Sequence, residues 1–319
     1  MTDGNKGFLS SVVVVSGSKS KEIEWVVSES RCEDFDLVLL DNPAKFTPQG
    51  LNIGIEYALA NGAEVIQMLG AHSSLNDGYF KNLSQIAKRD KDVAIFSPCY
   101  DFPQAGTMIE RSIQLFHLSR LGRNWQRISG VSRPVPGFGS GAFAVRREVF
   151  DAIGLFDEKF IRNQDNEFYH RAVKKGFRGY AFPELVYYYR TRKTLVKLKK
   201  QNFDYGKYFA LDPFSHSAKQ AAPALFYTLQ ISLLLITGIF HFFDMSRSAL
   251  FTIGSFMMIL GIYLTAIMVE SLSKFIKYGL AAVSLPSILI MMHFYYAMGS
   301  FSGFLFGFEK SGDKNKQSP

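Results

Sequence analysis

One carboxylate in the sequence stands where it could act as a general base. Asp165 lies within RNQDNEF, at the expected start of a helix that stops at Gly176. The positive end of a helix dipole keeps a carboxylate there ionised, and an ionised, fixed carboxylate can take a proton from a hydroxyl group. The alternative is that Asp165 only caps the helix, which Asp does often. The local pattern leaves both interpretations open.

A lone imidazole holds a second notable position. The stretch EVIQMLG (residues 64–70) predicts a buried strand, and His72 follows it after one further residue. Ligands of open α/β sheets bind at the carboxyl ends of strands, so His72 is a candidate ligand. With no carboxylate beside it, the ordinary alternative is a surface or core histidine.

A glycine-rich segment is the third feature. PGFGSGAFAVRREVF carries Gly137, Gly139 and Gly141, and glycine lets a loop bend freely or lets a backbone approach a ligand closely. The pattern after Gly141 changes from that of a strand to that of a helix. We therefore expect a loop that leads into a strand and then a helix.

The elements that must position these residues alternate along the chain. Strands are predicted at 10–18, 35–43, 63–70 and 93–100, and helices at 21–29, 47–62, 76–90 and 161–177, with a last extended segment at 177–190. Such alternation predicts an α/β fold with a mainly parallel sheet and crossover helices. A long region at 101–136 receives no element.

The C-terminal part has a different composition. Hydrophobic residues make up 47% of the chain, but they are concentrated after residue 220. Three apolar spans are expected, at 221–243, at 249–269, and from Phe275 or Tyr278 to about Met298. A bilayer crossing takes about 20 residues, so the first two spans are clear. The third contains Pro286 and His293, and both a crossing and a re-entrant dip stay open.

A basic segment joins the two parts. Residues 186–220 hold eight basic and two acidic residues, and Leu195 and Leu198 fall on one side of the stretch RTRKTLVKLKKQ. This pattern predicts a basic amphipathic helix at the surface of an anionic leaflet; a solvated helix face is the alternative. By the positive-inside rule the segment favours the cytoplasmic side.

The net charge, the cysteines and the N-terminal apolar run argue against several kinds of partner, site and targeting signal. The net charge is +8, but the basic residues lie beside the apolar spans and no reader motif accompanies them, so nucleic acid is not an expected partner. Cys32 and Cys99 have neither a metal-ligand spacing nor a disulfide pattern. The apolar run at 8–15 is typical of a first strand and not of a signal peptide, which predicts a cytoplasmic soluble part.

The order of these motifs resembles a known family. The stretches NPAKFTPQGLNIGIEYA, PGFGSGAFAVRREVF with RNQDNEFYHRAVKKGF, YYYRTRKTLVKLKKQNFDYGKYF and MMHFYYAMGSFSGF are similar to those of family 2 glycosyltransferases of the succinoglycan-biosynthesis glucosyltransferase type. The resemblance implies a cytoplasmic GT-A domain at 8–185, a basic interfacial segment at 186–220, two or three membrane helices at 221–309 and a disordered basic tail at 310–319.

The resemblance also implies roles for individual residues. Asp165 would be the general base, Gly139, Ser140, Gly141 and Ala142 would line the donor and acceptor sugars, Gln201 with Arg190 and Arg192 would lie near the donor diphosphate, and His72 would be a metal ligand. In the family a carboxylate opens the motif that ends at His72, and a divalent cation (Mg²⁺ or Mn²⁺) binds there. Here Gly70 stands in place of that carboxylate.

Two functions are compatible with this resemblance. The first is an inverting transferase at the inner membrane that moves a sugar from a nucleotide donor, expected to be UDP-linked, to a lipid-linked or polysaccharide acceptor. The second is a catalytically degenerate scaffold in a glycan-assembly complex. The second follows from Gly70 and from the short N-terminal part, which lacks the family's acidic nucleotide-binding loops.

Overall fold

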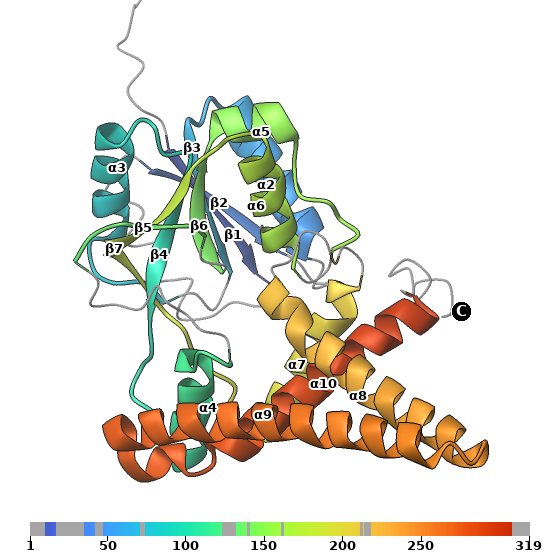
Figure 1. Ribbon diagram of the computed structural model, residues 1–319. Coiled ribbons are helices and arrows are strands. Elements are labelled where there is room, and N and C mark those ends of the chain that lie inside the picture. Colours follow the sequence, from blue (N-terminus) through green and yellow to red (C-terminus); the bar gives the residue numbers. More distant parts are fainter. Residues whose placement is uncertain are drawn as a thin grey trace, which may run out of the picture. The chain divides into compact units, whose positions relative to one another are not determined.

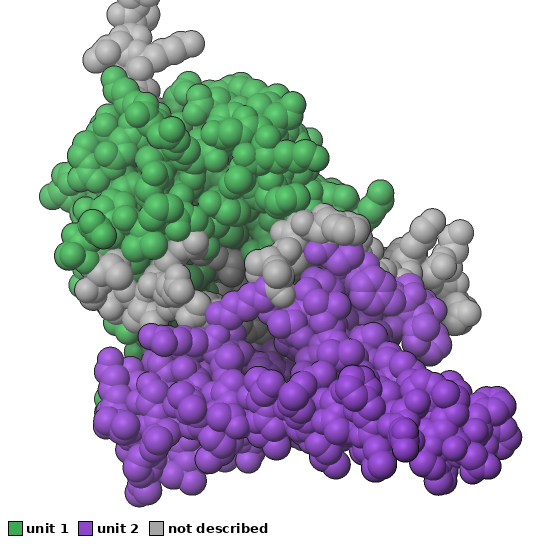
Figure 2. Space-filling view, viewed as in Figure 1, with its two compact units in different colours: residues 1–104, 125–190 green, residues 105–124, 191–319 purple. Residues whose placement is uncertain are grey.

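A computed structural model shows the chain as two compact units. It describes residues 10–16, 35–41, 47–70, 74–122, 132–138, 141–160, 163–210, 213 and 218–307. The first unit comprises Met1–Gln104 and Trp125–Arg190, and the second comprises Ala105–Asn124 and Thr191–Pro319. Figure 2 colours the two units separately, and each is described by itself. The predicted helix at 21–29 and His72, Gly139 and Ser140 lie outside the described residues.

The first unit is built on a mixed sheet. Its described strands are β1 (Ser10–Ser16), β2 (Phe35–Asp41), β3 (Val65–Gly70), β4 (Ile95–Asp101), β5 (Val135–Pro136), β6 (Ala142–Arg146) and β7 (Gly179–Tyr188), in the order β2-β1-β3-β6-β4-β7-β5. Strands β5 and β6 run antiparallel to their neighbours, and the others share one direction. The expected α/β fold class is confirmed, and every predicted strand that falls in the described part is present.

Helices cover both faces of this sheet. Helices α2 (Thr47–Ala60), α5 (Arg147–Ile153) and α6 (Gln164–Lys174) lie on one face, and α3 (Tyr79–Arg89) lies on the other (Figure 1). Side chains alternate between the faces along β3: Val65 and Leu69 join the cluster around α3, whereas Ile66 and Met68 join the cluster around α2, α5 and α6. A strand buried on both faces explains its continuous apolar sequence.

The second unit is helical. It contains α4 (Met108–Leu118), α7 (Leu195–Phe209), α8 (Ala218–Phe242), α9 (Ser246–Tyr278), the short 3₁₀ helix η2 (Gly279–Ala282) and α10 (Leu285–Phe306). Within the part of the chain that the structure describes, three helical segments are long and apolar enough to cross a membrane: Lys219–Phe242, Ser246–Ala282 and Leu285–Phe306. The predicted number of candidate spans is thus confirmed.

The third span begins later than its sequence suggests. The expected starts at Phe275 or Tyr278 are wrong, because both residues belong to α9. Gly279 ends that helix with a φ of 62°, a backbone conformation that favours glycine. Pro286 then stands in the first turn of α10, where its missing N–H costs nothing.

Helix α4 belongs to the second unit although it is inserted between strands of the first. Thr107 and Glu110 form a capping box at its start, with the Thr107 side chain accepting from the Glu110 N–H. Ile113 and Phe116 then join an apolar cluster with Leu285 of α10. This segment falls in the region to which the sequence assigned no element.

Candidate functional site

The carboxyl edge of the sheet brings two of the predicted features together. Strand β3 ends at Gly70, and its residue Leu69 pairs with Ala142 at the start of β6. Because β6 is antiparallel to β3, the glycine-rich loop enters the sheet at the edge where β3 leaves it. Gly70, Gly141 and Ala142 are therefore neighbours at one edge, as ligand binding in an open α/β sheet requires.

The sheet splits beside this point. Strands β4 and β6 pair only at Ile95 with Val145 and at Phe96 with Ala144. Pro98 follows within β4 and has no N–H to continue the ladder, which explains why the pairing stops. Ser97 is fully buried at the start of the split, and its hydroxyl has no hydrogen-bond partner among the described residues.

The far side of the split ends in an acid that the sequence analysis did not single out. Asp101 is the last residue of β4, and its Oδ1 accepts a hydrogen bond of 2.8 Å from the Phe102 N–H. The Asp101 carbonyl accepts another of 2.8 Å from the Tyr189 N–H. Its position directly after the predicted strand at 93–100 was the available signal.

Aromatic rings surround this strand end. The Tyr100 and Tyr187 rings meet edge to face at 5.8 Å, and the Phe102 and Tyr189 rings at 6.4 Å. The Tyr187 ring also lies beside Gly141, about a van der Waals contact from where a Cβ would stand. Aromatic faces next to a glycine backbone can stack on a flat or ring-shaped ligand.

Asp165 is at the same edge and is not the helix cap. The C-terminal end of α6 leads through Gly176 to Gly179, the opposite end of β7, so the first turn of α6 points back to the carboxyl edge (Figure 1). The N-cap is Asn163, which has a φ of 63° and makes no side-chain cap bond. Asp165 is the second helical residue, half-buried, with Oδ1 accepting from the Asn166 N–H at 2.9 Å. Asp165 is therefore not the N-cap residue itself, although its carboxylate satisfies one N–H of the first helical turn.

A stacked pair of rings joins the glycine-rich loop to α6. Phe138 lies on Tyr169 with centroids 4.8 Å apart and planes at 16°, and it meets Phe143 of β6 edge to face at 4.6 Å. Gly137 and Gly141 flank this anchor with φ values of 117° and 98°, a region that favours glycine. The predicted close or bent backbone at these glycines is confirmed for the described pair.

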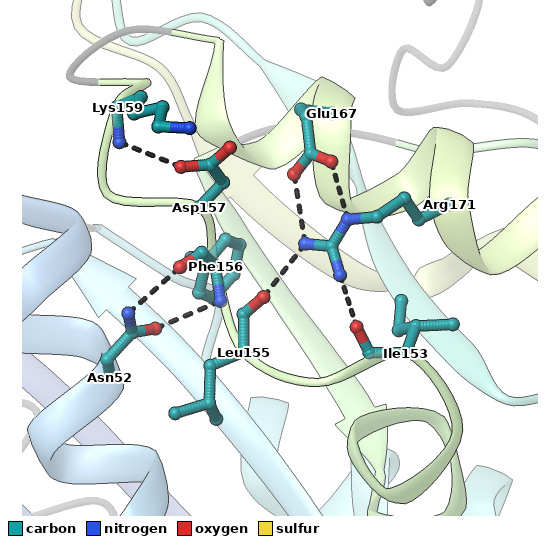
Figure 3. Close-up of polar contacts among 8 residues, drawn as sticks. All are labelled: Asn52, Ile153, Leu155, Phe156, Asp157, Lys159, Glu167 and Arg171. Carbon is teal, nitrogen blue, oxygen red and sulfur yellow. Dashed lines mark hydrogen bonds and ion pairs between the residues drawn. The ribbon is translucent and has the colours of Figure 1, made fainter.

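A polar clamp fixes residues 153–156 at the end of α5 (Figure 3). Asn52 of α2 donates to the Phe156 carbonyl at 2.9 Å and accepts from the Phe156 N–H at 3.0 Å. Arg171 pairs with Glu167 and donates to the carbonyls of Ile153 and Leu155. The backbone of residues 153–156 is therefore held between Asn52 of α2 and Arg171 of α6.

The described residues do not make a metal site. No group of three or more His, Cys, Asp or Glu side chains among them could hold an ion. Gly70, at the end of β3, has no side chain to offer, and His72 lies beyond the described part of that strand end.

The basic candidates fall in different units. Arg190 is exposed and follows Tyr189, whose N–H bonds to Asp101, so it stands at the carboxyl edge of the first unit. Arg192 and Gln201 belong to the second unit. Gln201 lies on α7 with its Nε2 3.4 Å from the Tyr205 hydroxyl.

Two curated proteins resemble the chain. It is 25% identical over 210 residues to the succinoglycan biosynthesis protein ExoA of Rhizobium meliloti (strain 1021), across 65% of this chain and 62% of that protein. It is 30% identical over 154 residues to a Methanococcus voltae dolichyl N-acetyl-alpha-D-glucosaminyl phosphate 3-beta-D-2,3-diacetamido-2,3-dideoxy-beta-D-glucuronosyltransferase, across 48% of this chain and 42% of that protein. The chain thus matches less than two thirds of the length of either relative.

A solved structure and a family profile complete the comparison. The mannosyltransferase PcManGT of Pyrobaculum calidifontis, in complex with GDP-Man and Mn²⁺, is 12% identical, with coverage of 93% of this chain and 87% of that chain and a TM-score of 0.47. The sequence profile described as "Glycosyl transferase family group 2" matches residues 65–306, well over half of the chain. The protein therefore belongs to glycosyl transferase family group 2.

Proposed function

We propose that this protein is a membrane-bound inverting glycosyltransferase that moves a sugar from a nucleotide donor to a lipid-linked or polysaccharide acceptor. The observation that carries the proposal is Asp165: a half-buried carboxylate in the first turn of α6, at the carboxyl edge of the sheet. The names of the two relatives, one in succinoglycan biosynthesis and one acting on a dolichyl phosphate sugar, support these acceptor classes.

The chemistry proposed for Asp165 is a single displacement. Its carboxylate takes the proton of an acceptor hydroxyl, and that oxygen bonds to the anomeric carbon of the donor sugar. The bond from this carbon to the nucleotide diphosphate breaks on the opposite face, and the diphosphate leaves with the electron pair. Attack and departure on opposite faces invert the configuration at the anomeric carbon.

The negative charge on the departing diphosphate needs cationic side chains nearby to stabilise it. Arg190 is at the carboxyl edge of the first unit, and a guanidinium is well suited to a diphosphate. We also assign this role to Arg192 and to the Gln201 segment on α7, from the family resemblance. Gly139, Ser140, Gly141 and Ala142 would lie against the sugars, where the left-handed Gly141 leaves the backbone without a side chain.

The membrane placement belongs to the same proposal. Helices α8 and α9 are long and apolar enough to cross, and the lysines of α7 favour the cytoplasmic leaflet of the inner membrane. The site would then draw a soluble nucleotide sugar from the cytoplasm and an acceptor from the bilayer.

Calorimetry with the purified full-length protein tests the donor half of this proposal. UDP is titrated with and without Mn²⁺, and GDP serves as a second nucleotide. Saturable UDP binding supports the proposal. Absence of binding by either nucleotide under both metal conditions would exclude a nucleotide-sugar donor.

A catalytically degenerate scaffold is the second candidate, and Gly70 is the observation that favours it. The strand end that carries a carboxylate in the family has no side chain here. A scaffold predicts that the protein releases no nucleotide from any UDP-sugar in the presence of membrane extract, whereas a transferase releases one nucleotide for each sugar moved.

A further inference from the structure

A larger share of helix α10 than of the other two candidate spans is buried against the rest of the protein. Of its most apolar window, 39% is buried in the protein, compared with 11% for the windows in Lys219–Phe242 and Ser246–Ala282. Its main packing partner is α7, with α4 and α8 beside it. Because α10 packs mainly on α7, the depth of the two helices in a membrane has to be considered together.

The contact between α7 and α10 is too close to admit lipid. A Cβ on Gly206 of α7 would overlap the Tyr296 carbonyl of α10, and a Cβ on Gly299 would overlap the Phe203 carbonyl. The Asn202 Nδ2 of α7 lies 2.9 Å from the Met292 sulfur. Backbones in contact through glycine mean that α7 and α10 must lie at the same depth relative to a membrane.

The opposite face of α7 is charged. At about 100° per residue, Lys197, Lys200 and Asp204 lie on the side away from the stripe formed by Asn202 and Gly206. Lys200 pairs with Asp204 at 3.3 Å, and its side chain is 77% exposed. This face needs water or lipid headgroups around it.

The opposite face of α10 is apolar. Phe294, Met298 and Leu305 recur at helical spacing, about half a turn from Met292 and Gly299, and they are 43%, 42% and 74% exposed. The pair of helices therefore has three layers: charges on α7, a glycine seam between the helices, and an exposed apolar stripe on α10. Such a profile suits the boundary between headgroups and acyl chains.

We propose that α10 does not cross the membrane and that α7 and α10 lie together along one leaflet. The charged face of α7 meets water and headgroups, and the stripe Phe294–Met298–Leu305 meets the acyl chains. The chain then crosses twice, with α8 and α9, so residues before α8 and residues after α10 are on one side. Were α10 a crossing, the glycine seam would carry Lys197, Lys200 and Asp204 into the hydrocarbon.

Charge in the terminal segment agrees with two crossings. Lys310, Lys314 and Lys316 follow α10 in the sequence, and lysines beside a span favour the cytoplasmic side. With three crossings these lysines would be on the opposite side from the basic segment around α7. With two, both basic segments share the cytoplasmic side.

Single cysteines in the full-length protein test the number of crossings. In a background with Cys32→Ser and Cys99→Ala, Val196→Cys marks the side before α8, Met245→Cys marks the turn between α8 and α9, and Ser318→Cys reports on the end. Val196 and Met245 are 75% and 47% exposed. Intact cells are treated with a membrane-impermeant maleimide, and permeabilised cells provide the total labelling.

The two-crossing arrangement predicts that only Met245→Cys is labelled in intact cells. Ser318→Cys should match Val196→Cys, with less than about a tenth of its total labelling before permeabilisation. Labelling of Ser318→Cys to the extent of Met245→Cys would show a third crossing and overturn the proposal. Protection of Met245→Cys in intact cells would equally overturn it, because α8 and α9 would then not cross.

The depth of α10 gives an independent measurement. Nitroxide labels at Phe294→Cys, Met298→Cys and Leu305→Cys are examined by oxygen and nickel accessibility in liposomes that contain anionic lipid. A helix along the leaflet holds all three at a similar shallow depth. A crossing helix would separate Phe294 from Leu305 by about 16 Å along the axis, and a depth gradient of that size would contradict the proposal.

Discussion

The ring of Phe138 stacks on the ring of Tyr169, and this pair ties the glycine-rich loop to the helix that carries Asp165. The centroids are 4.8 Å apart and the planes differ by 16°. Tyr169 follows Asp165 by one helical turn, so the two side chains share a face of α6. The loop and the proposed base are thus held on one side of one helix.

Loss of this stack should reduce transfer more than stability. Phe138→Ala removes a half-buried ring from a three-ring contact, and we expect the melting temperature to fall by a few degrees while kcat/KM falls at least tenfold. Sugar transfer and thermal unfolding are measured on the same preparation. Tyr169→Phe keeps both rings and serves as the control. If both variants had equally small effects on transfer, the glycine-rich loop would not belong to the active site.

Removal of the Asn52 side chain should lower the stability of the fold substantially. Asn52→Ala leaves the N–H and the carbonyl of Phe156 without their side-chain partner, at a cost of roughly 1–3 kcal/mol for each group. Thermal unfolding of the purified protein in detergent measures this loss of stability. Asn61→Ala is the matched control in the same region, because the Asn61 bond to the Tyr57 carbonyl is exposed. Equal shifts for both variants would show that the clamp does not stabilise the fold.

A buried glutamate should hold the turn after α4. Glu270 of α9 accepts a 2.8 Å hydrogen bond from the Arg120 N–H and lies 3.7 Å from the Lys274 ammonium. Glu270→Ala leaves that N–H unpaired, so we expect at least a fivefold faster tryptic cleavage after Arg120. Glu270→Gln retains an oxygen acceptor and should cleave at close to the parental rate. Parental cleavage of the alanine variant would mean that the turn is held by other contacts.

The glycine seam should tolerate no methyl group. Gly206→Ala places a Cβ against the Tyr296 carbonyl and should lower the free energy of unfolding by about 1–3 kcal/mol or more. Gly261→Ala on α9 is the matched control, since nothing stands within 4 Å of its added Cβ. Thermal unfolding in detergent compares them. A parental melting temperature for Gly206→Ala would contradict the close packing of α7 on α10.

The spacing of apolar residues predicted most of the helices and strands, because the residues within each element determine that spacing. The alternation in β3 and the apolar face of α2, with Ile55 and Ala58 buried, are visible locally. Even the family segment GLNIGIEYA could be recognised without knowing its role. Asn52 hydrogen-bonds to Phe156, which lies 104 residues away in the sequence. No local pattern predicts such a contact between distant segments.

The misses have similar causes. Helix α4 has a readable capping box at Thr107 and Glu110, yet its partners lie on α10, so the sequence does not show which unit it joins. The apolar run after Lys274 hides the end of α9, because only the left-handed Gly279 breaks it. The sequence left open whether Asp165 is the N-cap residue, because the N-cap and the second helical position are two residues apart and the choice depends on the backbone of Asn163.

The metal prediction rests on His72 and can be tested by substitution. If His72 is a ligand, His72→Ala should abolish the stimulation of transfer by Mn²⁺, because the preceding Gly70 supplies no alternative side chain. Transfer is assayed across a Mn²⁺ titration, with His170→Ala as the control at an exposed histidine. Unchanged Mn²⁺ stimulation in His72→Ala would place any metal elsewhere.

The most direct test of the proposed function is sugar transfer by Asp165→Asn. The full-length protein in liposomes receives a panel of UDP-sugars, including UDP-glucose, and a lipid extract as acceptor. The proposal predicts a loss of transfer of about 10²–10⁴-fold, with UDP affinity and melting temperature close to the parental values and full activity in Asp151→Asn, whose side chain is 60% exposed. Parental transfer by Asp165→Asn would contradict the assignment of Asp165 as the base.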